Sequence, residues 1–229
     1  MTPMHGSTMV GVVLVGYVGG ALPIGVLVAR RYGVDIRRHG SGNVGFTNVL
    51  RVLGWKPGLL VFLLDVAKGA GPVWLARRVC CSDTSGGRGA AVLAAVALAT
   101  IIGHSFSVFL RFGGGKGVST TLGAGLGVHA PTAALAFVVW LIVLAAWRYV
   151  SLGSVIAVGA VPVLLILFGQ PREFVIWGVV IAVLCTFRHR DNIGRLLRGE
   201  ERKFGRREKT PVENAGRAAA ADQPNGSSE

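Results

Sequence analysis

Two glycine-rich stretches of the sequence carry polar and cationic side chains suited to binding phosphate. The first, GSGNVGFTNVLR, ends at Arg51, and the second, GGGKG, contains Lys116. Glycine lets the main chain approach a ligand closely, so that successive N–H groups can surround an anion. A guanidinium and an ammonium group supply positive charge. The two stretches therefore predict two anion-binding loops, and a plain turn or flexible loop is the alternative for each.

The other residues of these stretches sharpen the prediction. In the first, Ser41, Asn43, Thr47 and Asn48 offer hydroxyl and amide groups to a polar ligand. The second is not a Walker A motif, because Lys116 is followed by glycine rather than by serine or threonine. A helix is expected directly after it and adds its positive N-terminal end. The glycines that would hold a phosphate are Gly114, Gly115 and Gly117.

Further polar residues stand near the ends of predicted helices. His189 and Asn192 are three residues apart, so a helix that continues through them places both on one face. Ser154 lies near the start of another helix, where packing or capping is the alternative to ligand binding. His104 and Ser105 do not indicate a Ser–His catalytic pair, because no G-x-S-x-G motif is present there and few acidic residues could orient the histidine.

Asp65 and Lys68 lie inside a long apolar segment. Their spacing of three residues puts them on one helical face, where they can pair. Ionisable groups at membrane depth are costly and usually face the protein interior. We expect a structural ion pair that supports the site, with direct catalysis as the alternative.

The elements that position these residues are transmembrane helices. Only 15% of the 229 residues are charged, against about 25% in soluble domains. Together with long apolar runs, this predicts an all-α polytopic membrane protein. The seven expected helices cover residues 9–29, 57–75, 90–103, 118–128, 131–147, 152–168 and 174–187. The fourth is too short to cross a hydrocarbon core of about 30 Å unaided, so we expect a partial or re-entrant span.

The distribution of Lys and Arg predicts the orientation of these helices. With seven spans, 19 of the 24 Lys and Arg residues fall on the side of the C-terminus and 4 on the opposite side. The positive-inside rule then places the C-terminus in the cytoplasm and the N-terminus outside. All candidate site segments fall on the cytoplasmic face. Anionic lipid headgroups explain the net charge of +13, so we exclude nucleic acid as a partner.

The chain divides into an expected membrane domain, residues 1–205, and a basic, then low-complexity tail, residues 206–229, that we expect to be disordered in the cytoplasm. No positive segment precedes the first helix, which favours a retained helix over a signal peptide. Cys80 and Cys81 are adjacent, and neither they nor Cys185 have partners at metal-ligand spacing. We predict neither a metal nor another cofactor.

Several segments taken together resemble one family. In chain order they are GSGNVGFTNVLR (40–51), LLDVAKG (63–69), GHSFSVFLRFGGGKGVSTTLG (103–123), SLGS (151–154) and HRDNIGRLLRGEERKFG (189–205). Their order and spacing resemble the PlsY family, the bacterial acyl-phosphate:glycerol-3-phosphate acyltransferases. Three positions depart from the family pattern: Ala21 and Phe46 stand where serine and a small residue are usual, and Ser107 replaces a common proline.

The resemblance implies a seven-helix, multi-pass enzyme of the bacterial inner membrane, with its active site facing the cytoplasm. It would transfer a fatty acyl group from acyl-phosphate to the sn-1 hydroxyl of glycerol 3-phosphate, the first acylation step of phospholipid synthesis. The products would be lysophosphatidic acid and phosphate. Its partners would be these substrates and membrane lipid, with a functional link to the enzyme that produces acyl-phosphate.

The resemblance also implies roles for individual residues. Ser41 and Arg51 match glycerol 3-phosphate ligands, with Asn43 and Thr47 as supporting contacts. Lys116 and the neighbouring glycines match the family's phosphate-holding loop. The residues that match positions around the acyl-phosphate and the glycerol hydroxyls are Ser154, His189 and Asn192. The predicted catalytic set is Ser41, Lys116, His189 and Asn192.

Two phosphorylated substrates match the two predicted anion sites. An acyl-phosphate has a good leaving group, so our hypothesis is direct attack by the glycerol hydroxyl, with the phosphate of the donor accepting the proton. A transporter or flippase for a phosphorylated metabolite is the alternative. It predicts inverted repeats and a site near the membrane midplane, whereas the sequence shows no internal repeat and gathers its polar motifs on one face. A non-catalytic scaffold would not explain the ordered motifs.

Overall fold

The computed structural model describes residues 6–79 and 83–205, and every regular element among them is helical, as predicted. In chain order the elements are α1 (Gly6–Ala21), α2 (Ile24–Arg31), η1 (Ile36–Arg38), α3 (Phe46–Leu53), α4 (Trp55–Val79), α5 (Gly87–Ser105), η2 (Val108–Leu110), α6 (Val118–Trp147), α7 (Val150–Leu167), α8 (Arg172–Arg188) and α9 (Arg190–Leu197). Cys80, Cys81 and the predicted tail, residues 206–229, lie outside the described residues.

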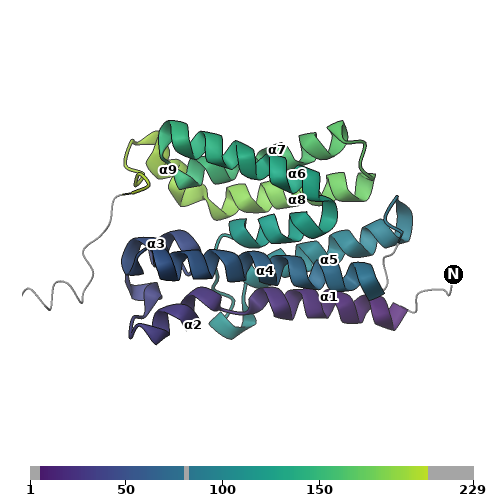
Figure 1. Ribbon diagram of the computed structural model, residues 1–229, viewed down its shortest axis with the longest axis horizontal. Coiled ribbons are helices and arrows are strands. Elements are labelled where there is room, and N and C mark those ends of the chain that lie inside the picture. The colour runs from purple at the N-terminus through teal and green to yellow at the C-terminus, as the bar shows by residue number, and fades with distance from the viewer. Residues whose placement is uncertain (1–5, 80–82, 206–229) are drawn as a thin grey trace, which may run out of the picture.

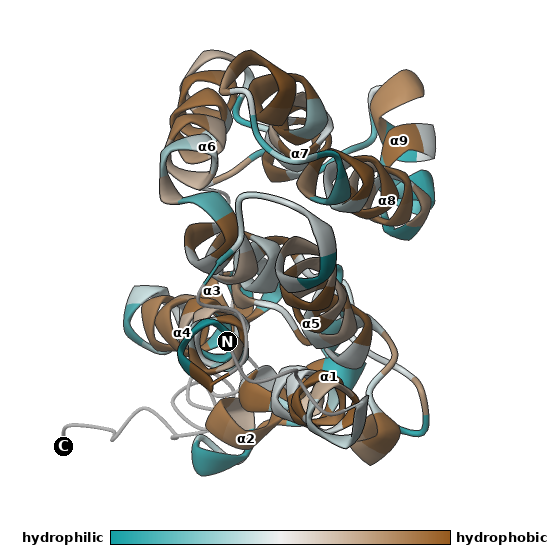
Figure 2. Ribbon diagram, turned by 90° about the vertical axis from the view of Figure 1, so that its right-hand side faces the viewer, coloured by the Kyte–Doolittle hydropathy of each residue, from teal (hydrophilic) through white to brown (hydrophobic). Residues whose placement is uncertain are grey.

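The long helices run side by side along the molecule (Figure 1). Viewed down their length, they form two groups, with α1, α2, α4 and α5 in one and α6, α7 and α8 in the other (Figure 2). The groups meet where α4 and α5 pack against α6 and where α5 packs against α8. The short helices α3 and α9 lie at the same end of the molecule, and α1 begins at the opposite end.

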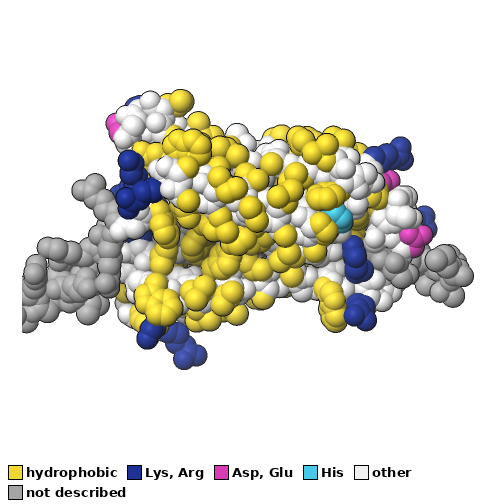
Figure 3. Space-filling view, turned by 45° about the horizontal axis from the view of Figure 1, so that its top comes forward, with side chains coloured by type: hydrophobic (Ala, Val, Ile, Leu, Met, Phe, Trp, Pro, Cys, Tyr) yellow, Lys and Arg dark blue, Asp and Glu magenta, His cyan; other side chains and the backbone are white. Residues whose placement is uncertain are grey.

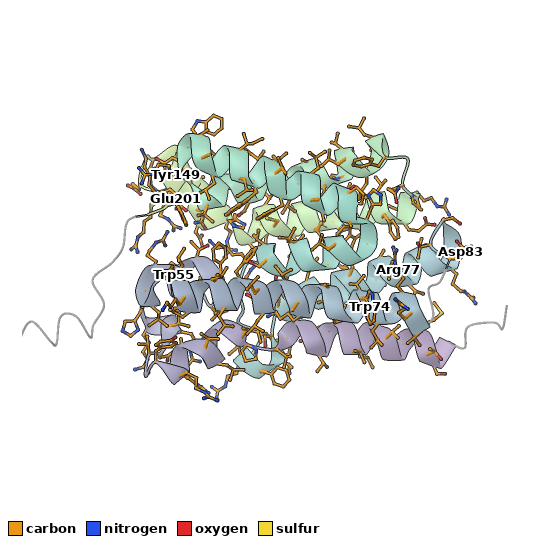
Figure 4. All side chains as sticks on the ribbon, viewed as in Figure 1. Trp55, Trp74, Arg77, Asp83, Tyr149 and Glu201 are labelled. Atoms are coloured by element: carbon orange, nitrogen blue, oxygen red, sulfur yellow. The ribbon has the colours of Figure 1, made fainter. Side chains whose placement is uncertain are left out.

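The surface of the bundle has the pattern of a membrane protein. Hydrophobic side chains cover its middle, and Lys and Arg gather toward both ends (Figure 3). In Figure 4, Trp55, Tyr149 and Glu201 mark one end and Trp74, Arg77 and Asp83 the other. An apolar band between aromatic and charged ends suits a lipid bilayer. Five described segments are long and apolar enough to cross one: Gly6–Arg31, Trp55–Val79, Gly87–Leu110, Val118–Trp147 and Val150–Leu167.

The first expected helix is broken into α1 and α2 at Pro23, as a proline inside a helix predicts. Two local features differ from the sequence-based expectation. The connection between the first two expected helices contains the helix α3. The two helices expected over 118–128 and 131–147 form one element, α6, with a sharp kink. At the kink, His129 leaves the helical region (φ −152°, ψ 98°), two residues before Pro131. Proline lacks the N–H that a continuous helix would need there.

The break between α1 and α2 is stabilised by polar side chains from elsewhere in the chain. Lys68 Nζ donates a hydrogen bond to the Leu22 carbonyl (2.8 Å), and Ser107 Oγ donates to the Ala21 carbonyl (2.6 Å). Lys68 also pairs with Asp65 at 2.9 Å, which confirms the pair expected from their spacing. Carbonyl groups inside an apolar bundle need such partners. The ion pair therefore helps to hold the broken helix against α4.

Candidate active site

One open cavity of about 470 Å³ brings the predicted polar motifs together. Ten of the eleven predicted site residues line it: Ser41, Asn43, Thr47, Arg51, Gly114, Lys116, Gly117, Ser154, His189 and Asn192. They come from α3 and its preceding loop, the loop before α6, the first turns of α7, and the junction of α8 with α9. Gly115 is the exception, because its N–H donates to the His104 carbonyl (3.2 Å) and so is not available to a ligand.

The loop ahead of α3 is held in shape by one buried amide. Asn48 is 1% exposed, and its Nδ2 donates to three main-chain carbonyls of residues 36–43 at 2.9–3.3 Å. Its Oδ1 accepts a hydrogen bond from the Ser41 N–H at 2.9 Å. Gly40 and Gly42 have φ values of +62° and +71°, which glycine adopts at little cost. The position of Ser41 in the cavity wall thus depends on Asn48, whose amide is hydrogen-bonded within the protein rather than offered to a ligand.

The loop that contains Lys116 is fixed from behind by α5 and α8. The Arg188 guanidinium donates hydrogen bonds at 2.9 Å to the carbonyls of Gly114 and Gly115. The His104 ring lies so close to Gly115 that an added Cβ would stand 2.1 Å from its Nε2. These glycines are therefore required by close packing as well as by backbone freedom. Arg188 was not among the predicted residues, because it stands next to the quoted motif rather than inside it.

Lys116 is linked to α9 and to the segment after it by a hydrogen-bonded network. Its Nζ donates to Asn192 Oδ1, and Asn192 Nδ2 donates to Glu201 Oε1 at 2.6 Å. Glu201 also accepts a hydrogen bond from Ser151 Oγ (2.7 Å) and pairs with Arg195 (2.8 Å). Burial alone would raise the pKa of Glu201, but these hydrogen bonds lower it. Glu201 therefore stays ionised. It was not among the predicted site residues, although it lies in the motif HRDNIGRLLRGEERKFG.

His189 is buried, and burial lowers its pKa to about 4, with the charge of Lys116 acting in the same direction. Its ring is therefore neutral near pH 7. Nδ1 lies 2.8 Å from the Cys185 carbonyl. A neutral ring that donates there keeps Nε2 as a hydrogen-bond acceptor. Such a weak base is better suited to orienting a hydroxyl group than to removing its proton.

The charge of the cavity wall suits anionic ligands. Six Lys or Arg residues line it against three Asp or Glu residues. The basic ones are Arg51, Lys116, Arg188, Arg190, Arg195 and Arg202. Within residues 6–79 and 83–205, no group of three or more His, Cys, Asp or Glu side chains is placed to hold a metal ion. Cationic side chains of this kind form strong hydrogen bonds to phosphate.

An apolar groove adjoins the polar cavity. The residues that line both are Phe46, Val118 and Ser119. A row of aromatic rings, Phe46, Phe62, Phe137 and Trp140, follows one wall, with successive centroids 5.3–6.3 Å apart. The site thus has a polar, cationic compartment that opens directly into an apolar one.

A family model described as glycerol-3-phosphate acyltransferase matches residues 10–199. A crystal structure described as PlsY, an integral membrane glycerol 3-phosphate acyltransferase in its glycerol 3-phosphate form, superposes with a TM-score of 0.81 at 41% identity, covering 86% of this chain and 96% of that one. The chain belongs to the PlsY family. A second PlsY structure, the lysophosphatidic acid form, gives a TM-score of 0.79 at 40% identity over 87% of this chain and 96% of its own.

Curated PlsY relatives agree with this assignment. The glycerol-3-phosphate acyltransferase of Rubrobacter xylanophilus is 46% identical over 85% of this chain and 94% of its own length. The enzyme of the same name from Thermus thermophilus is 46% identical over 88% of this chain and 98% of its own. The resemblance stated from the motifs is confirmed. The protein is an integral membrane acyltransferase, and its function is that of a glycerol-3-phosphate acyltransferase.

The protonation of Lys116 predicts how this PlsY enzyme responds to pH. Burial lowers the pKa of Lys116 to about 8, although the nearby Glu201 carboxylate opposes the shift. An ammonium group can pair with phosphate, and the ammonium form is present below that pKa and is lost as the pH rises through it. We therefore expect kcat/KM to fall above about pH 8. Lys116→Arg, whose charge persists, should remove this fall, and an unchanged profile in that variant would contradict the assignment.

Proposed function

We propose that the protein transfers the acyl group of an acyl-phosphate to the sn-1 hydroxyl of glycerol 3-phosphate, giving 1-acyl-glycerol 3-phosphate and phosphate. The observation that carries this proposal is the junction of a cationic cavity with an apolar groove. Glycerol 3-phosphate is wholly polar, and an acyl-phosphate joins a phosphate to a long apolar chain. The two compartments together match what these two substrates need to bury and to pair.

The wall of the cavity supports distinct roles for its residues. Ser41 and Arg51, with Asn43 and Thr47 beside them, bind glycerol 3-phosphate from the loop and helix α3. Lys116 and the loop that carries it bind the phosphate of the donor. Both polar ends of the Asn192 amide are already engaged, one by Lys116 and one by Glu201. We therefore assign Asn192 to position Lys116. Ser154 and His189 complete the wall around the reacting groups, with His189 Nε2 accepting from a glycerol hydroxyl.

The reaction requires no protein nucleophile. The glycerol hydroxyl oxygen attacks the acyl carbonyl carbon, a new C–O ester bond forms, and the C–O bond to phosphate breaks. The departing phosphate takes the hydroxyl proton. Binding both substrates across one cavity supplies proximity, and the fixed charge of Lys116 stabilises the developing negative charge. The low pKa of His189, about 4, agrees with a role in orientation.

We further propose seven crossings, with the N-terminus outside, the C-terminus in the cytoplasm and the active site facing the cytoplasm of a bacterial inner membrane. The kink at His129 divides α6 into two arms. We count each arm as one passage of the chain, although the first is too short to cross a hydrocarbon core of about 30 Å unaided. Helix α8 adds a span of 17 residues, about 25 Å at 1.5 Å per residue. The excess of Lys and Arg on the site face supports this orientation through the positive-inside rule.

Two assays test these proposals, one for the reaction and one for the orientation. Purified protein in liposomes, given palmitoyl-phosphate, should release phosphate only when glycerol 3-phosphate is present. The control for the donor is palmitoyl coenzyme A in place of palmitoyl-phosphate. In sealed membrane vesicles, glycerol 3-phosphate added outside should be acylated by inside-out vesicles and not by right-side-out ones. Release without glycerol 3-phosphate dependence contradicts the reaction, and uptake of glycerol 3-phosphate without release favours the transporter.

A further inference from the structure

We propose that the kink of α6 measures the acyl chain: His129 and Thr132 close the far end of the apolar groove and thereby limit the length of the chain that this enzyme transfers. The inference rests on the proposed function, since it takes the acyl donor as the occupant of the groove. It names a specificity-determining pair that lies far from the polar cavity.

The groove lies in the angle between the two arms of α6. Residues of the first arm (118–129), of the second arm (132–140) and of α7 (157–165) line it. Close to the kink the arms are in contact, since an added Cβ at Gly125 would stand 3.2 Å from the Ala133 Cβ. The arms thus enclose a space that opens toward Val118 and is closed where they join.

Polar side chains mark the closed end in a lining that is otherwise mostly apolar. His129 Nδ1 and Thr132 Oγ1 lie 2.9 Å apart, and the His129 ring packs on that of Phe168 with centroids 5.3 Å apart. Arg77 Nη2 donates to the Val128 carbonyl at 2.9 Å, beside the kink. A methyl terminus that advanced past this point would break the His129–Thr132 hydrogen bond and take that partner from the hydroxyl of Thr132, a residue that is 2% exposed.

The open end of the groove is at the reacting centre. Phe46, Val118 and Ser119 line both the apolar groove and the polar cavity, so the donor's carbonyl belongs at this boundary, with its phosphate on the cationic side. Figure 4 places Arg77 at the opposite end of the molecule from Glu201, so the groove runs along the helices away from the phosphate network. The distance between the two ends therefore corresponds to the length of the acyl chain.

That length can be estimated from the helix itself. From Val118 to His129 the chain advances by eleven residues, about 16 Å at 1.5 Å per residue. An extended acyl chain, with C–C bonds of about 1.5 Å in a zigzag, advances by roughly 1.3 Å per carbon. The groove thus holds about 12 or 13 carbons beyond the carbonyl. We expect donors of about 14 carbons to fill it and chains several carbons longer to be disfavoured.

The test is a profile of kcat/KM against donor length, measured with acyl-phosphates of increasing even carbon number. In His129→Ala the end of the groove is open. The ratio of kcat/KM for the longest donors to kcat/KM for the donor that the wild type prefers should rise by about tenfold. Ala133, 5% exposed and lining the groove one turn past the kink, offers the opposite change. Ala133→Leu should fill the closed end and move the optimum to shorter chains.

Leu126→Ala is the matched control, because Leu126 lies on the same arm but is 40% exposed on its outer face and does not line the groove. Its profile should equal that of the wild type. A wild-type profile in both His129→Ala and Ala133→Leu would contradict the proposal that His129 and Thr132 limit the chain length. The same shift in Leu126→Ala would also contradict it. Absence of activity with every acyl-phosphate in the wild type would instead contradict the proposed function, and the chain-length proposal with it.

Discussion

Replacing Lys116 by alanine is expected to lower kcat/KM by about 100-fold or more, the size of effect seen when one donor to a developing negative charge is removed. Lys116 lines the cavity and contacts Asn192, which in turn contacts Glu201. The alanine variant loses the cation and its hydrogen bond to the Asn192 amide, whereas Glu201 keeps its ion pair with Arg195. The measurement is glycerol 3-phosphate-dependent phosphate release by the purified protein. Lys116→Arg keeps the charge but not the shape of the side chain, so its kcat/KM should lie between those of the wild type and Lys116→Ala.

The matched control for this prediction is Lys203→Ala. Lys203 is exposed, two residues after Glu201, and does not line the cavity. Its Nζ lies over the Tyr149 ring, 5.7 Å from the ring centroid. Its loss should change kcat/KM by less than about twofold, because an exposed charge contributes little. If Lys116→Ala kept wild-type kinetics with an unchanged melting temperature, Lys116 would have no place in the phosphate site.

The helices and the residues that line the site could be predicted from the sequence better than the contacts that hold those residues in position. Apolar runs locate membrane helices because the bilayer requires continuous apolar segments. The pair Asp65–Lys68 follows from helical spacing alone. The helix α3 was missed because its polar first turn, after a glycine-rich loop, gives no long periodic signal. The kink at His129 could be placed only approximately, since Pro131 predicts a break but not its direction.

The supporting residues were missed for a different reason. Arg188 reaches the loop carbonyls of Gly114 and Gly115, more than seventy positions earlier in the chain. Glu201 joins Ser151 and Asn192, which belong to different helices. Contacts of this kind depend on how the helices pack, and no spacing rule within one segment encodes them. The glycine loop also differs in detail from a simple anion cradle, because the N–H of Gly115 is used inside the protein.

A single methyl group added to this loop should be as damaging as the loss of Lys116. In Gly114→Ala the new Cβ would stand 2.3 Å from the His104 carbonyl oxygen and 2.6 Å from that of Ser105. Both are main-chain atoms in the last turn of α5, so neither can rotate away as a flexible side chain would. The loop must shift and carry Lys116 with it, and we expect kcat/KM to fall by about 100-fold or more, since misplacement of about 1 Å has effects of this size.

Gly11→Ala separates this steric effect from a general intolerance of side chains at glycine. Gly11 lies in α1, and apart from its chain neighbours and the adjacent backbone of its own helix, no atom stands within 4 Å of its added Cβ. Alanine there should leave kcat/KM unchanged and stabilise the helix by about 0.5–1 kcal/mol. Melting temperatures measured beside the kinetics show whether Gly114→Ala is folded. A folded, fully active Gly114→Ala enzyme would mean that the loop binds phosphate in another conformation, and Lys116 would then act from a position that this packing does not define.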